Sequence, residues 1–100
     1  MKLKGKRVLV AGMGKSGVAA MEAALAEGAE VLLYDKKEES EIDDQIRNIA
    51  QQNAINCFWN RIPEKEEKPD YLVLSPGIPL DEEILKYGEA VGAEDRKSVV

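Results

Sequence analysis

The chain has 100 residues, of which 44% are hydrophobic and 33% are charged, and its formal net charge at pH 7 is −5. This length and composition predict one soluble globular domain, and the negative charge argues against a nucleic-acid-binding protein, whose contact surface is basic. The sequence has no histidine and one cysteine, so it predicts no zinc site and no histidine-dependent catalysis. Its apolar runs are short and its first residues lack the apolar core of a signal peptide, so no membrane contact is expected.

The first third of the chain predicts a strand, a helix and a second strand. Arg7 to Ala11 (RVLVA) is a short run rich in β-branched residues, as expected for a buried parallel strand. A helix is expected from Ser16 to Glu27, because apolar residues recur there at helical spacing and Gly28 follows as a C-terminal stop. Glu30 to Tyr34 is the second strand, and it ends at Asp35.

The remainder of the chain continues this alternation of strands and helices. The alternation predicts an α/β fold, a single domain in which a Rossmann-like parallel sheet is flanked by helices. The acidic residues of the 64–70 region are expected to form a solvated loop, not an acid–base pair. In chain order the expected elements are a helix from Ser40 to Asn53, a strand from Ile55 to Trp59, a loop from Arg61 to Asp70, a strand from Tyr71 to Leu74 and a helix from Asp81 to Val91.

Between the first strand and the first helix lies a glycine-rich loop, Gly12 to Gly17 (GMGKSG), which matches the pattern G-x-G-x-x-G. Gly14 leaves room for the backbone to approach a phosphate, and the amides of the first helical turn, aided by the helix dipole, face the anion. The alternative is that the three glycines serve only the close packing of helix on strand. The loop is not an ATP-binding P-loop, because Leu9 occupies the position of the required earlier glycine.

Two further segments are expected at the same edge of the sheet, because parallel strands end side by side. Asp35 lies 18 positions after Gly17, near the spacing at which an acid accepts hydroxyl protons from a ribose; a nucleobase donor and the turn that follows it are alternative partners. Ser75 to Pro79 (SPGIP) follows the last predicted strand, and Gly77 can turn backbone amides toward a ligand. The three segments together predict a nucleotide-binding crevice.

Three stretches of the sequence, VLVAGMGKSGVAA, the YD that closes the second strand and DYLVLSPGIPLDEEIL, resemble the N-terminal domain of the Mur ligases. The resemblance is strongest to the members that join D-glutamate to UDP-N-acetylmuramoyl-L-alanine in peptidoglycan synthesis, with ATP and Mg²⁺, through an acyl-phosphate. It covers residues 6–92 and implies a Rossmann-like, UDP-binding domain at residues 1–92. It also implies a cytoplasmic protein, which agrees with the single cysteine, Cys57.

The resemblance implies that three loops hold UDP. The glycine loop then lies by the diphosphate, the residues that close the second strand lie by the uracil, and the loop after the fourth strand lines the opposite side of the crevice. The implied site residues are Gly14, Lys15, Ser16 and Gly17 in the first loop, Asp35 and Lys36 in the second, and Ser75, Pro76 and Gly77 in the third. No catalytic and no metal-binding residue is expected in this chain.

In this family the ATP and Mg²⁺ sites belong to a central domain, which the resemblance does not cover. Residues 93–100 (AEDRKSVV) are therefore expected to be a polar tail at a truncation point. The expected partners are the substrate and the central and C-terminal domains of the same enzyme. The chain alone is expected to bind UDP-N-acetylmuramoyl-L-alanine and not to catalyse.

Two other interpretations stay open at the level of sequence. A small NAD(H)-binding module has the same glycine pattern and the same acid after the second strand, although a nicotinamide site does not require SPGIP. The other is a structural fragment with no competent site, because removing neighbouring domains exposes surface and frees loops. A binding measurement with UDP and NAD separates the three interpretations.

Overall fold

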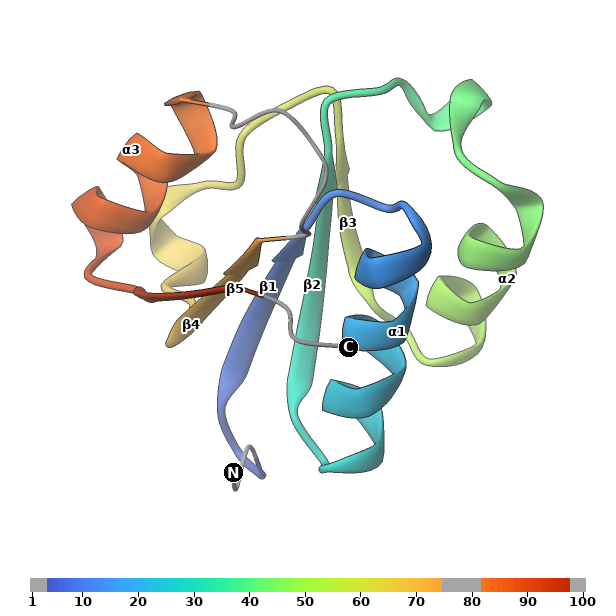
Figure 1. Ribbon diagram of the computed structural model, residues 1–100, viewed down its shortest axis with the longest axis horizontal. Coiled ribbons are helices and arrows are strands. Elements are labelled where there is room, and N and C mark those ends of the chain that lie inside the picture. Colours follow the sequence, from blue (N-terminus) through green and yellow to red (C-terminus); the bar gives the residue numbers. More distant parts are fainter. Residues whose placement is uncertain (1–3, 75–81, 98–100) are drawn as a thin grey trace.

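The computed structural model describes residues 4–74 and 82–97, in which strands and helices alternate along the chain (Figure 1). Within these ranges five strands form one sheet in the order β3-β2-β1-β4-β5, and every neighbouring pair is parallel. This confirms the predicted α/β fold with a Rossmann-like sheet. In chain order the elements are β1 (Arg7–Ala11), α1 (Lys15–Ala26), β2 (Glu30–Asp35), the 3₁₀ helix η1 (Glu39–Glu41), α2 (Asp44–Gln52), β3 (Asn56–Trp59), the 3₁₀ helix η2 (Lys65–Glu67), β4 (Tyr71–Leu74), α3 (Glu82–Val91) and β5 (Glu94–Lys97).

The sheet is the middle one of three layers, with α1 and α2 on one face and α3 on the other (Figure 1). Alternate residues of β1 and of β2 pack into the two hydrophobic cores, one on each face of the sheet. Val10 and Leu33 belong to the core on the side of α1 and α2, whereas Leu9 and Leu32 belong to the core on the side of α3. Each of the four is at most 1% exposed, and burying one such side chain stabilises the fold by about 1.5–3 kcal/mol. Burial on both faces explains the unbroken apolar sequence of these strands.

The order of the strands creates a topological switch point beside β1. The chain first builds β1, β2 and β3 outward in one direction and then returns to place β4 on the other side of β1. Ala11, the last residue of β1, consequently pairs with Tyr34 on one side and with Leu74 on the other. Ligands of open parallel sheets bind outside the carboxyl ends of the strands at such a point. The strands β1, β2 and β4 all end at this point.

The structure divides the helix expected from Ser40 to Asn53 into the 3₁₀ turn η1 and the helix α2. The division falls at Asp43, whose Oδ1 accepts a hydrogen bond of 2.8 Å from the amide of Gln45 and so caps α2. Ser40 lies inside η1 instead, so the second of two residues able to cap a helix is the one that starts it. The expected end is confirmed, because Asn53 is the C-terminal cap, and the helix buries Ile46 and Ala50.

The expectation of a polar tail from residue 93 onward is wrong for residues 94–97, which form the edge strand β5. β5 pairs with β4 in parallel, from Tyr71 opposite Glu94 to Leu74 opposite Lys97. The amide of Ala93 donates to the carbonyl of Gly88 at 2.9 Å, which closes α3 immediately before the strand. An edge strand pairs through its backbone, so a polar sequence does not prevent it from forming.

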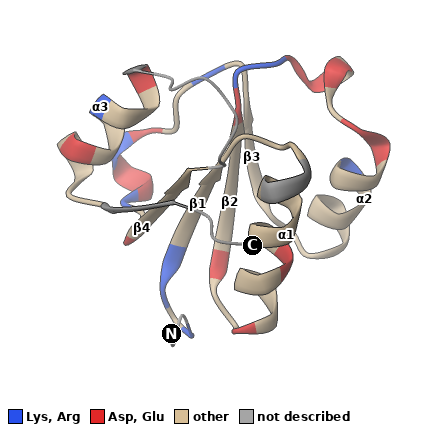
Figure 2. Ribbon diagram, in the orientation of Figure 1, with Lys and Arg blue, Asp and Glu red and all other residues tan. Residues whose placement is uncertain are grey.

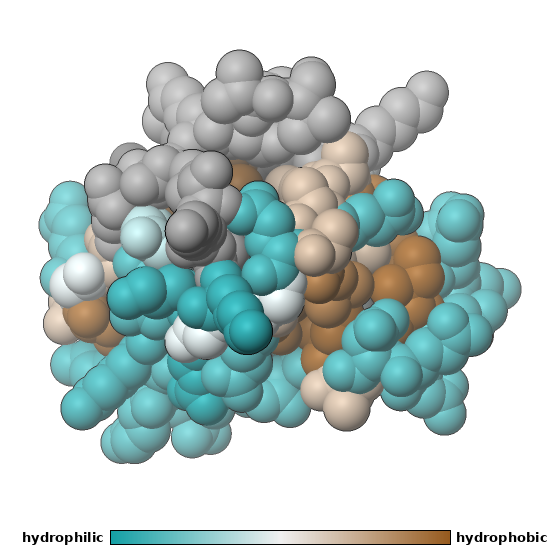
Figure 3. All heavy atoms as spheres, turned by 90° about the horizontal axis from the view of Figure 1, so that it is seen from below, coloured by the Kyte–Doolittle hydropathy of each residue, from teal (hydrophilic) through white to brown (hydrophobic). Residues whose placement is uncertain are grey.

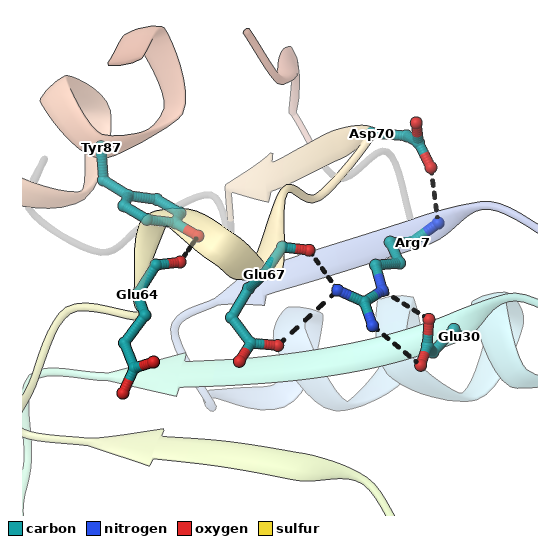
Figure 4. Close-up of polar contacts among 6 residues, drawn as sticks. All are labelled: Arg7, Glu30, Glu64, Glu67, Asp70 and Tyr87. Carbon is teal, nitrogen blue, oxygen red and sulfur yellow. Dashed lines mark hydrogen bonds and ion pairs between the residues drawn. The ribbon is translucent and has the colours of Figure 1, made fainter. Parts of the chain in front are cut away.

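At the opposite edge, where β1 begins, a cluster of charged residues joins β1 to its neighbours (Figure 4). Nε of Arg7 donates to Oε2 of Glu30 on β2 at 2.6 Å, and Nη1 donates to the carbonyl of Glu67 in η2. The amide of Arg7 donates to Oδ2 of Asp70 at 2.9 Å, and the amide of Asp70 returns a bond of 2.8 Å to the carbonyl of Arg7. These four residues, which we term the Arg7 cluster, fasten the loop before β4 to the sheet.

The same loop is also fastened to α3. The hydroxyl of Tyr87 donates to the carbonyl of Glu64 at 2.8 Å, and burial raises the pKa of Tyr87, so the hydroxyl keeps its proton (Figure 4). The acidic side chains of this loop are exposed as expected, except the half-buried Glu67, although the loop itself is attached on two sides. Figure 3, which views the molecule from this edge, shows mainly hydrophilic residues, with hydrophobic ones on the side of α1 and α2.

Candidate functional site

The glycine loop joins β1 to α1 at the switch point of the sheet. Gly12 has a φ of +94°, which favours glycine, and its amide donates to the carbonyl of Tyr34 at 2.8 Å. Gly14 is the N-terminal cap of α1, and its carbonyl accepts the bond of 3.0 Å that Val18 donates. By helix geometry the amides of residues 15–17 precede this first intrahelical bond and point out of the helix end. The positive end of the helix dipole lies there too, so this end is suited to an anion.

Two glycines of the loop have different structural requirements. A Cβ on Gly17 would lie 1.7 Å from the carbonyl oxygen of Gly12, so only glycine allows α1 to approach the loop as it does. Among the residues that the structure describes, a Cβ on Gly14 would meet no atom within 4 Å. Packing therefore accounts for the glycine at position 17 and not for the one at position 14. The space beside Gly14 is where the sequence predicts a phosphate.

Asp35, the last residue of β2, contacts three segments of the chain. Its Oδ2 accepts a hydrogen bond of 2.8 Å from the amide of Met13 in the glycine loop. Its Oδ1 accepts one of 2.9 Å from the amide of Lys37 in the turn after β2, and its main-chain carbonyl accepts one of 2.8 Å from the amide of Asn60, just beyond β3. We term Asp35 and these three partners, Met13, Lys37 and Asn60, the Asp35 junction. Of the partners proposed from sequence, the following turn is the one that the structure shows.

The turn after β2 brings positive charge to this edge in an otherwise acidic chain. Lys36 and Lys37 are both exposed, and the turn is blue in Figure 2 directly after β2. The acidic residues of η1 follow, red in the same view. The two lysines and the acidic residues that follow them therefore place both signs of charge in this turn.

The predicted site residues fall into three groups in the structure. Those of the glycine loop lie in the loop and the first turn of α1, and those after β2 lie at the Asp35 junction. Contact of any of them with UDP stays a prediction. Gly14, Lys15, Ser16 and Gly17 form the first group, for which the side chains at 15 and 16 are not described; Asp35 and Lys36 form the second; and Ser75, Pro76 and Gly77 lie outside the described residues.

Sequence reasoning missed Met13, Lys37 and Asn60 as parts of this edge. Met13 and Lys37 take part through their backbone amides, which any residue type except proline supplies, so their side chains carry no signal. Asn60 also takes part through its backbone amide, but its residue type was a signal in the sequence. It follows a strand directly, and asparagine tolerates the left-handed region, where its φ of +57° lies, better than most residues. An asparagine after a strand is thus a usable sign of a turn at this edge.

A groove of about 680 Å³ lies beside the edge strand β3, and Asp44, Arg47, Cys57 and Trp59 are among the residues that line it. Burial, with a smaller contribution from Glu39, raises the pKa of Cys57 to about 11. The thiol is therefore protonated at neutral pH, and a protonated thiol is a poor nucleophile. Cys57 does not make this groove a catalytic site.

Among the residues in the described ranges, no group of three or more histidine, cysteine, aspartate or glutamate side chains is arranged to hold a metal ion. No helix within residues 4–74 and 82–97 is both long and apolar enough to cross a bilayer. The groups at the carboxyl ends of the strands, which we call the loop edge, are suited to binding a ligand. The first-turn amides of α1 can bind an anion, and the carboxylate of Asp35 can accept a hydrogen bond from a donor.

Residues 6–94 match the family described as Mur ligase MurD-like, N-terminal domain. Similar curated proteins include the UDP-N-acetylmuramoylalanine--D-glutamate ligases of Thermoanaerobacter sp. (strain X514), 40% identical over 89 residues, and of Caldicellulosiruptor saccharolyticus, 35% identical over 95 residues. These matches cover 89% and 94% of this chain but 20% and 21% of the relatives, so the chain spans about a fifth of their length.

A solved structure with the same fold is that of SirC, precorrin-2 dehydrogenase, with a TM-score of 0.61 over 94% of this chain and 43% of that one. The two sequences are 19% identical, so this likeness shows the shared fold alone. The resemblance inferred from the sequence motifs is confirmed by the family match, which runs from residue 6 to residue 94. The chain belongs to the Mur ligase family, as a MurD-like N-terminal domain.

Proposed function

We propose that this chain is the substrate-binding N-terminal domain of a UDP-N-acetylmuramoyl-L-alanine:D-glutamate ligase, in which it holds the UDP part of the substrate. The family to which it belongs and the name of its curated relatives support this proposal. The observation that carries it is geometric. The N-terminus of α1 and the carboxylate of Asp35 lie together at the switch point of the sheet, joined through the amide of Met13.

In this proposal each part of UDP meets groups of matching chemistry. The diphosphate lies against the first-turn amides of α1, where the helix dipole stabilises negative charge. The uracil, which presents an N–H donor, lies by the carboxylate that closes β2. The binding residues are then Gly14, Lys15, Ser16 and Gly17 for the diphosphate, Asp35 and Lys36 for the uracil, and Ser75, Pro76 and Gly77 for the opposite wall.

ATP and Mg²⁺, which the ligase reaction uses, do not fit this chain's own residues. Leu9, where a P-loop has its first glycine, is fully buried in β1 between Leu32 and Leu72. We therefore assign no step of amide-bond formation to the residues described. In the proposal, the remainder of such a ligase supplies that chemistry, in the cytoplasm, during peptidoglycan synthesis.

Calorimetric titration of the chain with UDP, UDP-N-acetylmuramoyl-L-alanine and NAD, run in parallel, tests the proposal. We expect both uridine ligands to bind with one-to-one stoichiometry and NAD to give no heat of binding. Binding of NAD alone would contradict the proposal and identify an NAD(H)-binding module. The absence of binding by all three would contradict it as well and would favour a fragment without a competent site.

A further inference from the structure

We propose that Asp35 is a positioning residue: its carboxylate holds the glycine loop and the turn after β2 in a fixed relation, so that the diphosphate half of the site depends on it. The inference rests on the proposed function, which assigns Asp35 only to the uracil. It adds a role toward the part of the ligand that this side chain is not expected to touch.

The carboxylate bridges two loops with one oxygen each. Oδ2 accepts from the amide of Met13 at 2.8 Å, and Oδ1 accepts from the amide of Lys37 at 2.9 Å. The backbone of Asp35 is itself held in place, because Asp35 pairs with Trp59 in the sheet and its carbonyl accepts a hydrogen bond of 2.8 Å from the amide of Asn60. A rigid strand end therefore holds both loops through a single side chain.

The glycine loop needs such a hold more than the rest of the chain does. Glycine has more conformational freedom to lose than any other residue, and two glycines flank Met13. The bond from Met13 to Asp35 lies between the bond that Gly12 donates to Tyr34 and the first turn of α1. Without it, the backbone between the end of β1 and the helix amides loses a fixed point at its centre.

Positioning and direct contact are compatible, because an ionised carboxylate offers about four lone-pair directions and these two bonds use two of them. The two roles differ in what they predict for a ligand that has no base. A carboxylate near a diphosphate repels it, so removing the charge of Asp35 without any loss of loop geometry leaves inorganic pyrophosphate binding unchanged or tighter. A positioning role predicts the opposite sign, weaker binding of pyrophosphate.

The test measures binding of inorganic pyrophosphate and of UDP by calorimetry to the wild-type chain and to Asp35→Ala and Asp35→Asn. We expect Asp35→Ala to weaken pyrophosphate binding about tenfold and UDP binding by more than that. Asp35→Asn, which has nearly the same size, keeps one acceptor oxygen and turns an NH₂ group toward the other amide, so its effect should be intermediate. This variant carries the test if Asp35→Ala does not fold.

Asp43→Ala is the matched control. Asp43 also accepts one backbone amide, that of Gln45 at 2.8 Å, but it lies at the start of α2, outside the Asp35 junction. We expect its pyrophosphate affinity to equal that of the wild type. A ligand-free readout accompanies the titration: the amide proton of Met13 should shift upfield and exchange faster with solvent in both Asp35 variants and not in Asp43→Ala.

Each result separates this inference from the proposed function. Weaker UDP binding with unchanged or tighter pyrophosphate binding in the Asp35 variants would overturn the positioning role and leave the proposed function standing. An unchanged Met13 amide in those variants would overturn it too. If the wild-type chain bound neither ligand, the proposed function itself would fail, and this would be known before any variant was compared.

Discussion

At each end of the parallel strands one charged residue joins loops to the sheet, and the two residues do so with opposite chemistry. In this comparison the two edges are the one where the strands begin and the one where they end. At the edge where the strands begin, Arg7 donates, and its acceptors include the carboxylates of Glu30 and Asp70. At the edge where the strands end, Asp35 accepts, and its side-chain donors are the backbone amides of Met13 and Lys37.

The difference separates a part of the molecule built for stability from one suited to a ligand. In the Arg7 cluster the positive side chain of Arg7 is paired within the protein with the negative side chains of Glu30 and Glu67. At the Asp35 junction the donors that the described residues offer to the carboxylate are the backbone amides of Met13 and Lys37, and the adjoining helix end carries the positive end of the helix dipole. The comparison predicts that changes at the first edge alter stability alone and that changes at the second alter binding.

The largest effect is expected for Gly17→Ala, which tests whether the loop edge also has a purely structural component. The added Cβ would lie 1.7 Å from the Gly12 carbonyl oxygen, so the loop or the helix must move. We expect a loss of about 3 kcal/mol in the free energy of unfolding, measured by urea denaturation. Gly14→Ala is the control, since its Cβ meets no described atom within 4 Å: the loss of stability should stay below about 1 kcal/mol, the cost of alanine at a helix N-terminal cap, while UDP affinity falls about tenfold. Equal stability of the two variants would contradict this assignment.

The reactivity of Cys57 reports on how the outer strand β3 is packed. With its pKa raised to about 11 by burial, the thiolate fraction at pH 8 is roughly a hundredfold smaller than for an ordinary thiol. Alkylation by iodoacetamide at pH 8 should therefore be slower by that order in the native chain than in the urea-unfolded chain. The native rate should rise tenfold per pH unit until about pH 11. Equal rates in the native and unfolded chains would show that β3 is not packed as described.

Arg7→Ala is expected to have a smaller effect, on stability only. It removes the hydrogen bonds to Glu30 and to the carbonyl of Glu67, and because the side chain is about a third exposed we expect a loss of roughly 1 kcal/mol. Thermal unfolding should show this as a fall in Tm of roughly 4–8 °C. Pyrophosphate and UDP affinities, measured on the folded variant, should match the wild type. A tenfold weaker affinity would erase the distinction between the two edges.

The smallest effect is expected at Asn60, whose φ of +57° lies in the left-handed region. Asn60→Gly should be neutral, because glycine adopts this conformation freely, whereas Asn60→Val should cost about 1 kcal/mol. Both variants keep the amide that donates to the carbonyl of Asp35. Chemical denaturation of the pair measures the difference, and equal stabilities would show that the turn after β3 can change its path.

The inner strands and the glycine loop were predictable from sequence because their signals are local. The apolar run of β1 and the G-x-G-x-x-G pattern each depend on residues within one short segment. The start of α2 was placed four residues early, because Ser40 and Asp43 are both good caps and only the folded chain selects between them. β5 was not predicted, because an edge strand forms through backbone pairing and its polar sequence shows no strand pattern.

The candidate site was predictable in its position but not in its connections. Gly14, Gly17 and Asp35 were identified at one edge, and the structure brings them together. The bond between Asp35 and the amide of Met13 spans 22 positions and involves a group common to nearly every residue, so no side-chain pattern announces it. The ties of Arg7 to Glu67 and Asp70 are hidden for a similar reason, because charged residues in a loop look alike whether they are solvated or paired.

The most direct test of the central claim is a map of backbone amide chemical shifts of the chain during titration with UDP. We predict progressive shifts at residues 14–17 and at Asp35, with Arg7 and Asp70 at the opposite edge unchanged. Shifts confined to the Arg7 edge or to the groove beside β3, or shifts produced by NAD and not by UDP, would contradict the assignment of the loop edge as a UDP site.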